Sequence, residues 1–282
     1  MRSYLVSVFA VAIVTLVASL PAVSAGQLPL SPARESGSSV SPVFEGWFQN
    51  QDGTFTLSFG YFNRNGEEVL DIPIGANNFI EPGDINQGQP THFLTSRHWG
   101  VFTVTVPADF GDQQAIWTLI SGGETIAIPG RLHIDYEIEV LKDGASGNVP
   151  PSITFDPGSP AVQGPTGVTI GPRAIAVGTP LTLSVSGRDD LVRRPTDIPF
   201  GPADRPAITM TWVKHQGPGQ VTFSESMVAI NSASGETTTT AMFSAPGDYL
   251  LRVTANDYSG IRRAGNAQCC WTNGFVRVRV TE

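Results

Sequence analysis

The chain has 282 residues, of which only 15% are charged, and its formal net charge is −8. Such a sequence has no basic stripe of the kind that phosphate contacts require, which argues against nucleic acid as a partner. Its 30 glycines and 22 prolines interrupt short apolar runs, and the long Ala, Leu, Glu and Lys stretches of helices are missing. This composition predicts an all-β protein.

The N-terminus has the features of a secretory signal peptide. Arg2 precedes an apolar run over 4–20, and small residues follow at 23–25. The pattern predicts a signal peptide over 1–25, with an N-terminal membrane anchor as the alternative, although the run is slightly shorter than the about 20 residues of a spanning helix. We therefore expect a secreted or periplasmic protein, soluble after export and without a membrane span.

The first folded domain is expected over 43–143, after a Ser-, Pro- and Gly-rich flexible leader over 26–42. Its clearest strand is 54–61, where every second residue is Phe, Leu or Tyr and hydroxyl residues alternate with them. The pattern is typical of a half-buried antiparallel strand and predicts a β-sandwich. Further strands are expected at 100–106, 115–120 and 131–140, and Asn65-Gly66 is expected to close a hairpin.

A Pro- and Gly-rich stretch over 144–172 is predicted to be the linker between two domains, with room for a first strand of the second. The second domain, 173–282, again shows period-two alternation. Each strand there has one apolar and one polar face, as the two antiparallel sheets of a sandwich require. The expected strands are 181–187, 208–213, 249–255 and 276–280.

Two segments of the second domain resemble a known extracellular repeat: TWVKHQGPGQVTFS at 211–224 and TTTAMFSAPGDYLLRVTAND at 238–257. They are similar to the PKD-type immunoglobulin-like repeat, and the resemblance covers about 167–282. It implies a spacer or binding module, with Trp212 in the core and Tyr249 at the tyrosine corner of an immunoglobulin-like sandwich. The chain lacks the aromatic-Asp-x-Gly-Asp-Gly run of that family. The first domain is similar to a module of uncharacterised secreted bacterial proteins.

Two long loops, 188–206 and 257–274, are expected to open at the same end of the second sandwich. Loops longer than about 12 to 15 residues are usually functional or disordered, so we expect the interaction surface here, with Trp271 as a candidate binding residue. We expect no cofactor, with calcium as the alternative, since carboxylates can coordinate it, although they also form Asx turns. The candidate ligands are Asp189, Asp190 and Asp257.

Cys269 and Cys270 are the only cysteines, and they are adjacent. Free thiols seldom persist in an oxidising compartment, yet neighbouring Cα atoms lie about 3.8 Å apart across a trans peptide, less than the about 4.4 to 6.8 Å usual for disulfides. Three states therefore stay open: a vicinal disulfide, thiols buried beside Trp271, or an intermolecular, metal or redox role.

The sequence contains no G-x-S-x-G, H-E-x-x-H or phosphate-binding glycine loop, so we expect no enzyme. His92 and His98 lack the spacing of zinc ligands. Trp47 and Trp99 have polar or glycine neighbours and could stack on sugar rings, with core packing as the alternative.

The sequence favours a non-catalytic secreted protein that acts as an extracellular or periplasmic interaction or structural module. Its partner would be an extracellular or envelope protein. A carbohydrate-binding accessory protein with a polysaccharide partner is the first alternative, and an enzyme with an unrecognised site is the weaker one.

Overall fold

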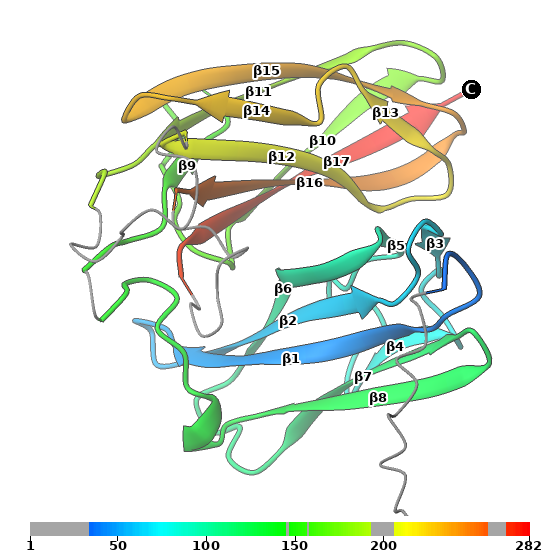
Figure 1. Cartoon of the computed structure of the whole chain (residues 1–282), viewed down its shortest axis with the longest axis vertical. Helices are drawn as coiled ribbons and strands as arrows, with labels where there is room; N and C mark the ends of the chain where they lie inside the picture. Colours follow the sequence, from blue (N-terminus) through cyan, green and yellow to red (C-terminus); the bar gives the residue numbers. More distant parts are fainter. Residues whose placement is uncertain (1–33, 145–146, 157, 193–205, 259–268) are drawn as a thin grey trace, which may run out of the picture. The chain divides into compact units, whose positions relative to one another are not determined.

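The structure, a computed structural model, describes residues 34–144, 147–156, 158–192, 206–258 and 269–282. Ala33–Glu282 form one compact unit, and its described regular elements are strands and one short 3-10 turn (Figure 1). The expected signal peptide and the first part of the expected leader lie outside the described residues. No helix in the described ranges has the length and apolar character needed to cross a bilayer.

The first half of the unit is an antiparallel β-sandwich with an aromatic core. Phe59 stacks on Phe102 with ring centroids 5.3 Å apart, and the edge of Trp117 meets both rings. All three side chains are buried. The sheets are β1 (Val40–Gln49), β2 (Phe55–Asn63) and β6 (Ser96–Val106); β4 (Asn78–Glu81), β7 (Gln114–Ser121) and β8 (Glu124–Arg131); and the small pair β3 (Leu70–Asp71) and β5 (His92–Phe93).

Three local predictions for this half are wrong. The strand expected at 131–140 is instead a single 3-10 turn, η1 (Ile134–Tyr136), because β8 already ends at Arg131. The leader ends earlier than expected, since Val40 is fully buried at the start of β1. Asn65 closes no hairpin: β2 pairs with β1 and β6, and the Asn65 side chain is buried and bonds the backbone of Ser38.

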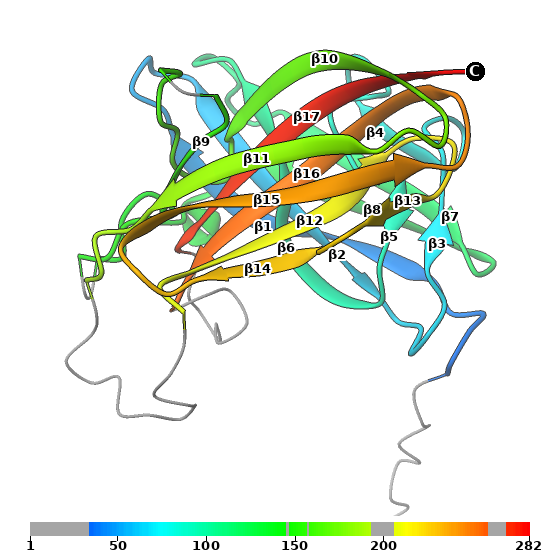
Figure 2. The ribbon, with the colours of Figure 1, turned by 90° about the horizontal axis from the view of Figure 1, so that it is seen from above.

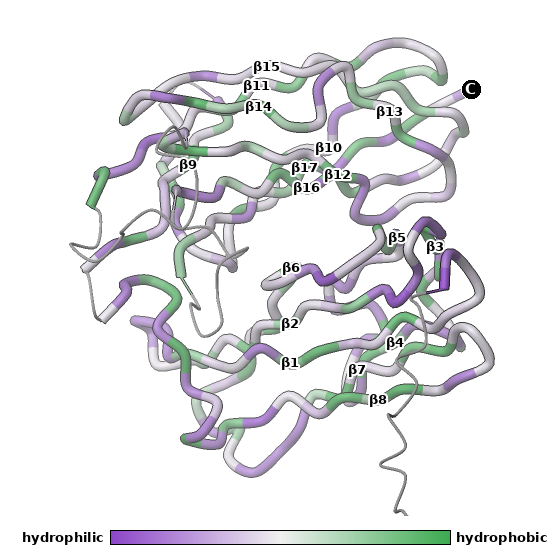
Figure 3. Tube along the Cα trace, viewed as in Figure 1, coloured by the Kyte–Doolittle hydropathy of each residue, from purple (hydrophilic) through white to green (hydrophobic). Residues whose placement is uncertain are grey.

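The second half is a sandwich of a five-stranded and a four-stranded sheet, and its four predicted strands are confirmed (Figure 2). Short hydrophobic and hydrophilic stretches follow one another along these strands (Figure 3). The sheets are β10 (Val168–Ala176), β17 (Trp271–Thr281), β16 (Gly247–Asp257), β12 (Ile208–Gln216) and β14 (Met227–Ile230); and β13 (Val221–Phe223), β15 (Ser234–Phe243), β11 (Leu181–Arg188) and β9 (Ser152–Thr154).

The core of this sandwich has the two markers that the sequence indicated. Trp212 is 2% exposed and lies 6.4 Å from Phe155 and 6.3 Å from Phe223, measured between ring centroids. The Tyr249 hydroxyl donates to the carbonyl of Ala245 at 2.8 Å and accepts from the amide of Gly219 at 3.0 Å. A tyrosine that bonds backbone a few residues upstream is the tyrosine corner of immunoglobulin-like sandwiches.

The stretch expected to be a linker is part of the second sandwich. β9 pairs with β11, and Ile153 and Phe155 lie in the core. Their side chains sit against Gly274 of β17, where a Cβ atom would overlap both. Ile153 and Phe155 explain why this stretch folds with the sandwich instead of forming a linker. In a solvated linker, both apolar side chains would be exposed to water.

The two sandwiches meet through sheet faces that the sequence predicted to be exposed to solvent. β6 offers backbone carbonyls, and β16 and β17 carry the side chains that bond them, so the sheet β1-β2-β6 lies next to the five-stranded sheet (Figure 1). Thr56 and Ser58, on the hydroxyl face of β2, are fully buried. We call the contact between these two sheets the junction.

Candidate functional site

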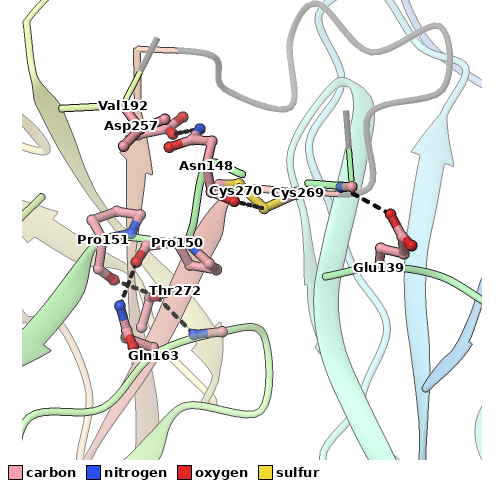
Figure 4. The surroundings of a disulfide bond; sticks show 12 residues. Glu139, Asn148, Pro150, Pro151, Gln163, Val192, Asp257, Cys269, Cys270 and Thr272 are labelled. Carbon is pink, nitrogen blue, oxygen red and sulfur yellow. Dashed lines mark hydrogen bonds between the residues drawn. A yellow bond between two sulfur atoms is a disulfide. The ribbon is translucent and has the colours of Figure 1, made fainter. Parts of the chain in front are cut away.

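Cys269 and Cys270 form a disulfide just before β17 (Figure 4). Both residues are buried, at 5% and 1% exposure. The carbonyl oxygen of Asn148 lies 3.6 Å from the Sγ of Cys270. A disulfide carries no thiol proton, so this is a packing contact between the sulfurs and the segment around Asn148.

A hydrogen-bonded network anchors the segment around Asn148 to the starts and ends of the long strands. The Asn148 amide donates to the carboxylate of Asp257 at the end of β16. The Thr272 hydroxyl donates to the carbonyl of Pro151 and accepts from the amide of Gly164 (Figure 4). In the described residues, hydrogen bonds therefore tie the segment that contacts the disulfide to the end of β16 and the start of β17.

Two of the three candidate calcium ligands make local hydrogen bonds, whereas Asp257 accepts from the distant Asn148. Asp189 accepts from the amide of Leu191 at 2.7 Å, and Asp190 accepts from the amide of Val192 at 3.0 Å. Both are Asx turns, the alternative that the sequence left open. In the part of the chain that the structure describes, no three His, Cys, Asp or Glu side chains are grouped to hold a metal ion. Calcium stays a prediction.

Trp271, the candidate binding residue of this end, lies in the junction. It is 3% exposed and packs with Phe48, Ile138 and Val140. Its indole N–H donates to the carbonyl of Gly100 at 3.1 Å. A Cβ atom on Gly100 would overlap the indole ring, and Gly100 has φ +50°, so glycine is the residue that suits this position.

The structure does not bring Trp47 and Trp99 together. Trp47 is partly buried, its indole N–H donates to the carbonyl of His133 at 2.7 Å, and its ring meets the edge of Phe55. Trp99 is 39% exposed, with the Arg97 guanidinium 3.9 Å from the ring centroid. Since β2 separates their strands, no continuous platform forms from the two rings.

The centre of the junction is polar. Arg252 of β16 is 7% exposed and donates to the carbonyl of Val101 at 2.7 Å. Burial lowers the pKa of Arg252 to about 10, while the nearby Tyr61 raises it. Burial, reinforced by Arg252, lowers the pKa of His215 to about 3, so this imidazole is neutral at pH 7. Its Nε2 lies 2.7 Å from the carbonyl oxygen of Gly88.

A second polar cluster joins β3 and β5 to β12. Asp71 Oδ1 lies 2.9 Å from Lys214 Nζ and 2.8 Å from His92 Nδ1. Burial opposes ionisation of Asp71, but the hydrogen bonds from Lys214 and His92 lower its pKa overall. Burial lowers the pKa of His92 despite the bond to Asp71. At neutral pH the cluster therefore holds an ionised Asp71 and a neutral His92 beside Lys214.

Beside this cluster lies a cavity of about 340 Å³ between the two sandwiches. Its walls come from the end of β3 and the turn after it, from Thr91, from the end of β12 and the turn after it, and from the start of β16. The lining residues are Asp71, Pro73, Ile74, Thr91, Gln216, Gly217, Pro218 and Asp248.

Sequence reasoning missed the residues that make the junction. Arg252 occupies a strand position that alternates with core residues, so the pattern predicted it to face water, and Asn273 fell within the loop expected over 257–274. The sequence held no clear signal for them, since Thr272, Asn273 and Gly274 are typical of a solvent-exposed loop, whereas all six residues from Trp271 to Val276 are buried in the structure. Alternation tells which face a residue takes, but it does not tell what covers that face.

No protein-family model matches the chain, and no curated protein matches it. The crystal structure of domains 4 and 5 of the S-layer protein SbsC is 15% identical, with a TM-score of 0.26, over 61% of this chain and 66% of that one. The D00-D0 domain of intimin is 10% identical, with a TM-score of 0.28, over 86% and 100%. In the longer SbsC structures the chain spans 28% to 30% of the matched chain. Likeness this weak assigns no function, and the PKD resemblance stays a prediction.

Proposed function

We propose that this chain is a non-catalytic structural or interaction module that acts outside the cytoplasm, with its two sandwiches working as one rigid body. The observation that carries the proposal is the junction. Side chains from β16 and β17 donate to backbone carbonyls of β6: Arg252 to Val101 at 2.7 Å, and Asn273 to Gly100 at 2.8 Å.

The junction resists bending because its buried donors and acceptors lie on opposite sandwiches and are hydrogen-bonded to each other. A buried donor or acceptor left without a partner costs about 1 to 3 kcal/mol, so a small rotation that breaks these bonds is unfavourable before any apolar area is exposed. Thr91 adds a backbone bond from its amide to the carbonyl of His215 at 2.8 Å. Rigidity of this kind suits a protein that holds two surfaces at a fixed distance.

The partner that we propose is an extracellular or envelope protein. The test is chemical cross-linking of the mature protein in the native cell envelope, with Gly100→Ala as a variant that loosens the junction and Gly123→Ala as its control. Gly123 also has a positive φ, but open space surrounds it.

A single stoichiometric protein partner, captured by the wild type and by Gly123→Ala but weakly by Gly100→Ala, would support the proposal. Capture of no protein, combined with retention on an insoluble polysaccharide, would favour the carbohydrate-binding alternative, for which the exposed Trp99 ring is the observation in favour. Turnover of a substrate by the purified protein would overturn the non-catalytic assignment.

A further inference from the structure

The cavity between the sandwiches has the location and size of a ligand site. Its volume of about 340 Å³ lies at the small end of the roughly 300 to 1,000 Å³ of small-molecule pockets, which form preferentially between domains. Thr91 and Asp71 come from the first sandwich, and Gly217 and Asp248 from the second. A ligand here would touch both sandwiches.

The polar groups of the cavity are mainly hydrogen-bond acceptors. Asp71 and Asp248 contribute carboxylates, and the buried Thr91 Oγ1 has no hydrogen-bond partner within the described residues. A buried hydroxyl without a partner costs free energy, which a bound hydrogen-bonding ligand would recover. The arrangement therefore favours a ligand that is rich in donors, such as the hydroxyl groups of a polyol.

The charges around the cavity are balanced. Asp71 lies 2.9 Å from the ammonium of Lys214, which is 2% exposed at its side chain, and Asp248 lies 2.9 Å from the guanidinium of Arg279. Because each carboxylate is already paired with a basic side chain, the balance favours an uncharged ligand.

The remaining lining is apolar. Pro73, Ile74 and Pro218 carry no side-chain hydrogen-bonding group. A ligand pocket typically combines such apolar walls with a few polar groups that fix orientation. The ring of a sugar has both matching surfaces, since its C–H face is apolar and its hydroxyls are donors.

We propose that this cavity binds a small uncharged sugar, whose hydroxyls donate to Asp71, Asp248 and Thr91 while its C–H face packs on Pro73, Ile74 and Pro218. The site is separate from Trp99, which lies on β6, and it does not depend on the proposed mechanical function. A sugar bound here would add a contact across the edge of the junction.

The test uses the full mature chain and four sugars: glucose, galactose, mannose and N-acetylglucosamine. Each is titrated to the solubility-limited millimolar range while the backbone amide signals are followed by NMR. We expect at least one sugar to shift the amides of Thr91, Ile74 and Gly217, with a millimolar dissociation constant. Thr91→Val and Asp248→Asn should each weaken binding several-fold.

Asp135→Asn is the matched control, because Asp135 is an exposed carboxylate on η1 and does not line the cavity. It should bind as the wild type does. The proposal is overturned if none of the four sugars shifts these amides. It is also overturned if a sugar shifts signals around Trp99 instead and Trp99→Ala, rather than the cavity variants, abolishes the shifts.

Discussion

The interiors of the two sandwiches and the junction between them are built on different principles. In the interiors, apolar side chains alternate along each strand and are held by burial, as Trp117 and Trp212 show. In the junction, Arg252 and His215 are buried among backbone carbonyls. Both faces of a sheet can therefore be buried, but only the face that packs inside its own sandwich is recognised by apolar residues in the sequence.

The largest expected effect lies in an interior. Trp212→Ala should lower the free energy of unfolding by about 3 to 5 kcal/mol, since it removes a fully packed aromatic ring and leaves a cavity. Chemical denaturation measures this. Trp99→Ala is the control, because Trp99 is 39% exposed, and it should cost far less. Equal losses in the two variants would mean that Trp212 is not the core residue described.

In the junction, Gly100→Ala should lower the free energy of unfolding by about 1 to 3 kcal/mol, the usual cost of inserting a methyl group into packed structure. The new Cβ would overlap the Trp271 indole. Gly123→Ala, in a turn with open space, should cost less. The same denaturation series checks both variants. If they behave alike, the strain comes from φ and the junction is not tightly packed there.

Acid should destabilise the folded protein first through a buried histidine of the junction. Burial lowers the pKa of His215 from the ordinary 6.5 to about 3, so below pH 6.5 the unfolded chain binds this proton and the folded chain does not. The free energy of unfolding should therefore fall as pH drops from 6.5 toward 3, by up to about 1.4 kcal/mol per pH unit. His92, whose pKa burial also lowers, acts in the same direction.

Thermal melts at several pH values measure this slope. His215→Gln retains a side-chain donor for the carbonyl of Gly88 but cannot take up the proton, so most of the slope should disappear, and His92→Gln should remove a further part. Asp71 contributes only at lower pH, because its pKa is lowered and its stabilising ionised form is lost below the ordinary carboxyl range. An unchanged slope in His215→Gln would show that His215 is not buried as a neutral ring.

The smallest effect is expected at the surface. Asp248 and Arg279 form an ion pair at 2.9 Å, but both side chains are mostly exposed. Such pairs contribute little to stability, so Asp248→Asn should melt as the wild type does. A clear loss of stability would show that this pair belongs to the junction rather than to the solvent-exposed rim.

The sequence predicted most of the second sandwich and only part of the first. The alternation around Trp212 and the turn before Tyr249 are local signals, and local signals determine β12 and β16. The turn η1 was missed because apolar residues alternate through 131–140 as they would in a strand. The prediction for Asn65 was wrong because Asn-Gly is typical of a tight turn, and the sequence does not show that the Asn65 amide is buried against the backbone of Ser38.

The candidate sites were harder to predict, because each depends on contacts between segments far apart in the chain. Asp71 meets Lys214 across the two sandwiches and His92 within the first. Arg252 lies beside Val101, 151 positions away in the sequence. Neither pairing leaves a pattern in spacing, since no motif relates a strand to the sheet that covers it from another domain.

The burial of Trp271 has a consequence for protein engineering. Immunoglobulin-like domains are commonly treated as cassettes that can be cut out and fused to new neighbours. Excised on its own, the second sandwich would expose the Trp271 indole and the guanidinium of Arg252 on one sheet face. That face would promote aggregation in solution. The smallest fragment suited to fusion is therefore the pair of sandwiches together.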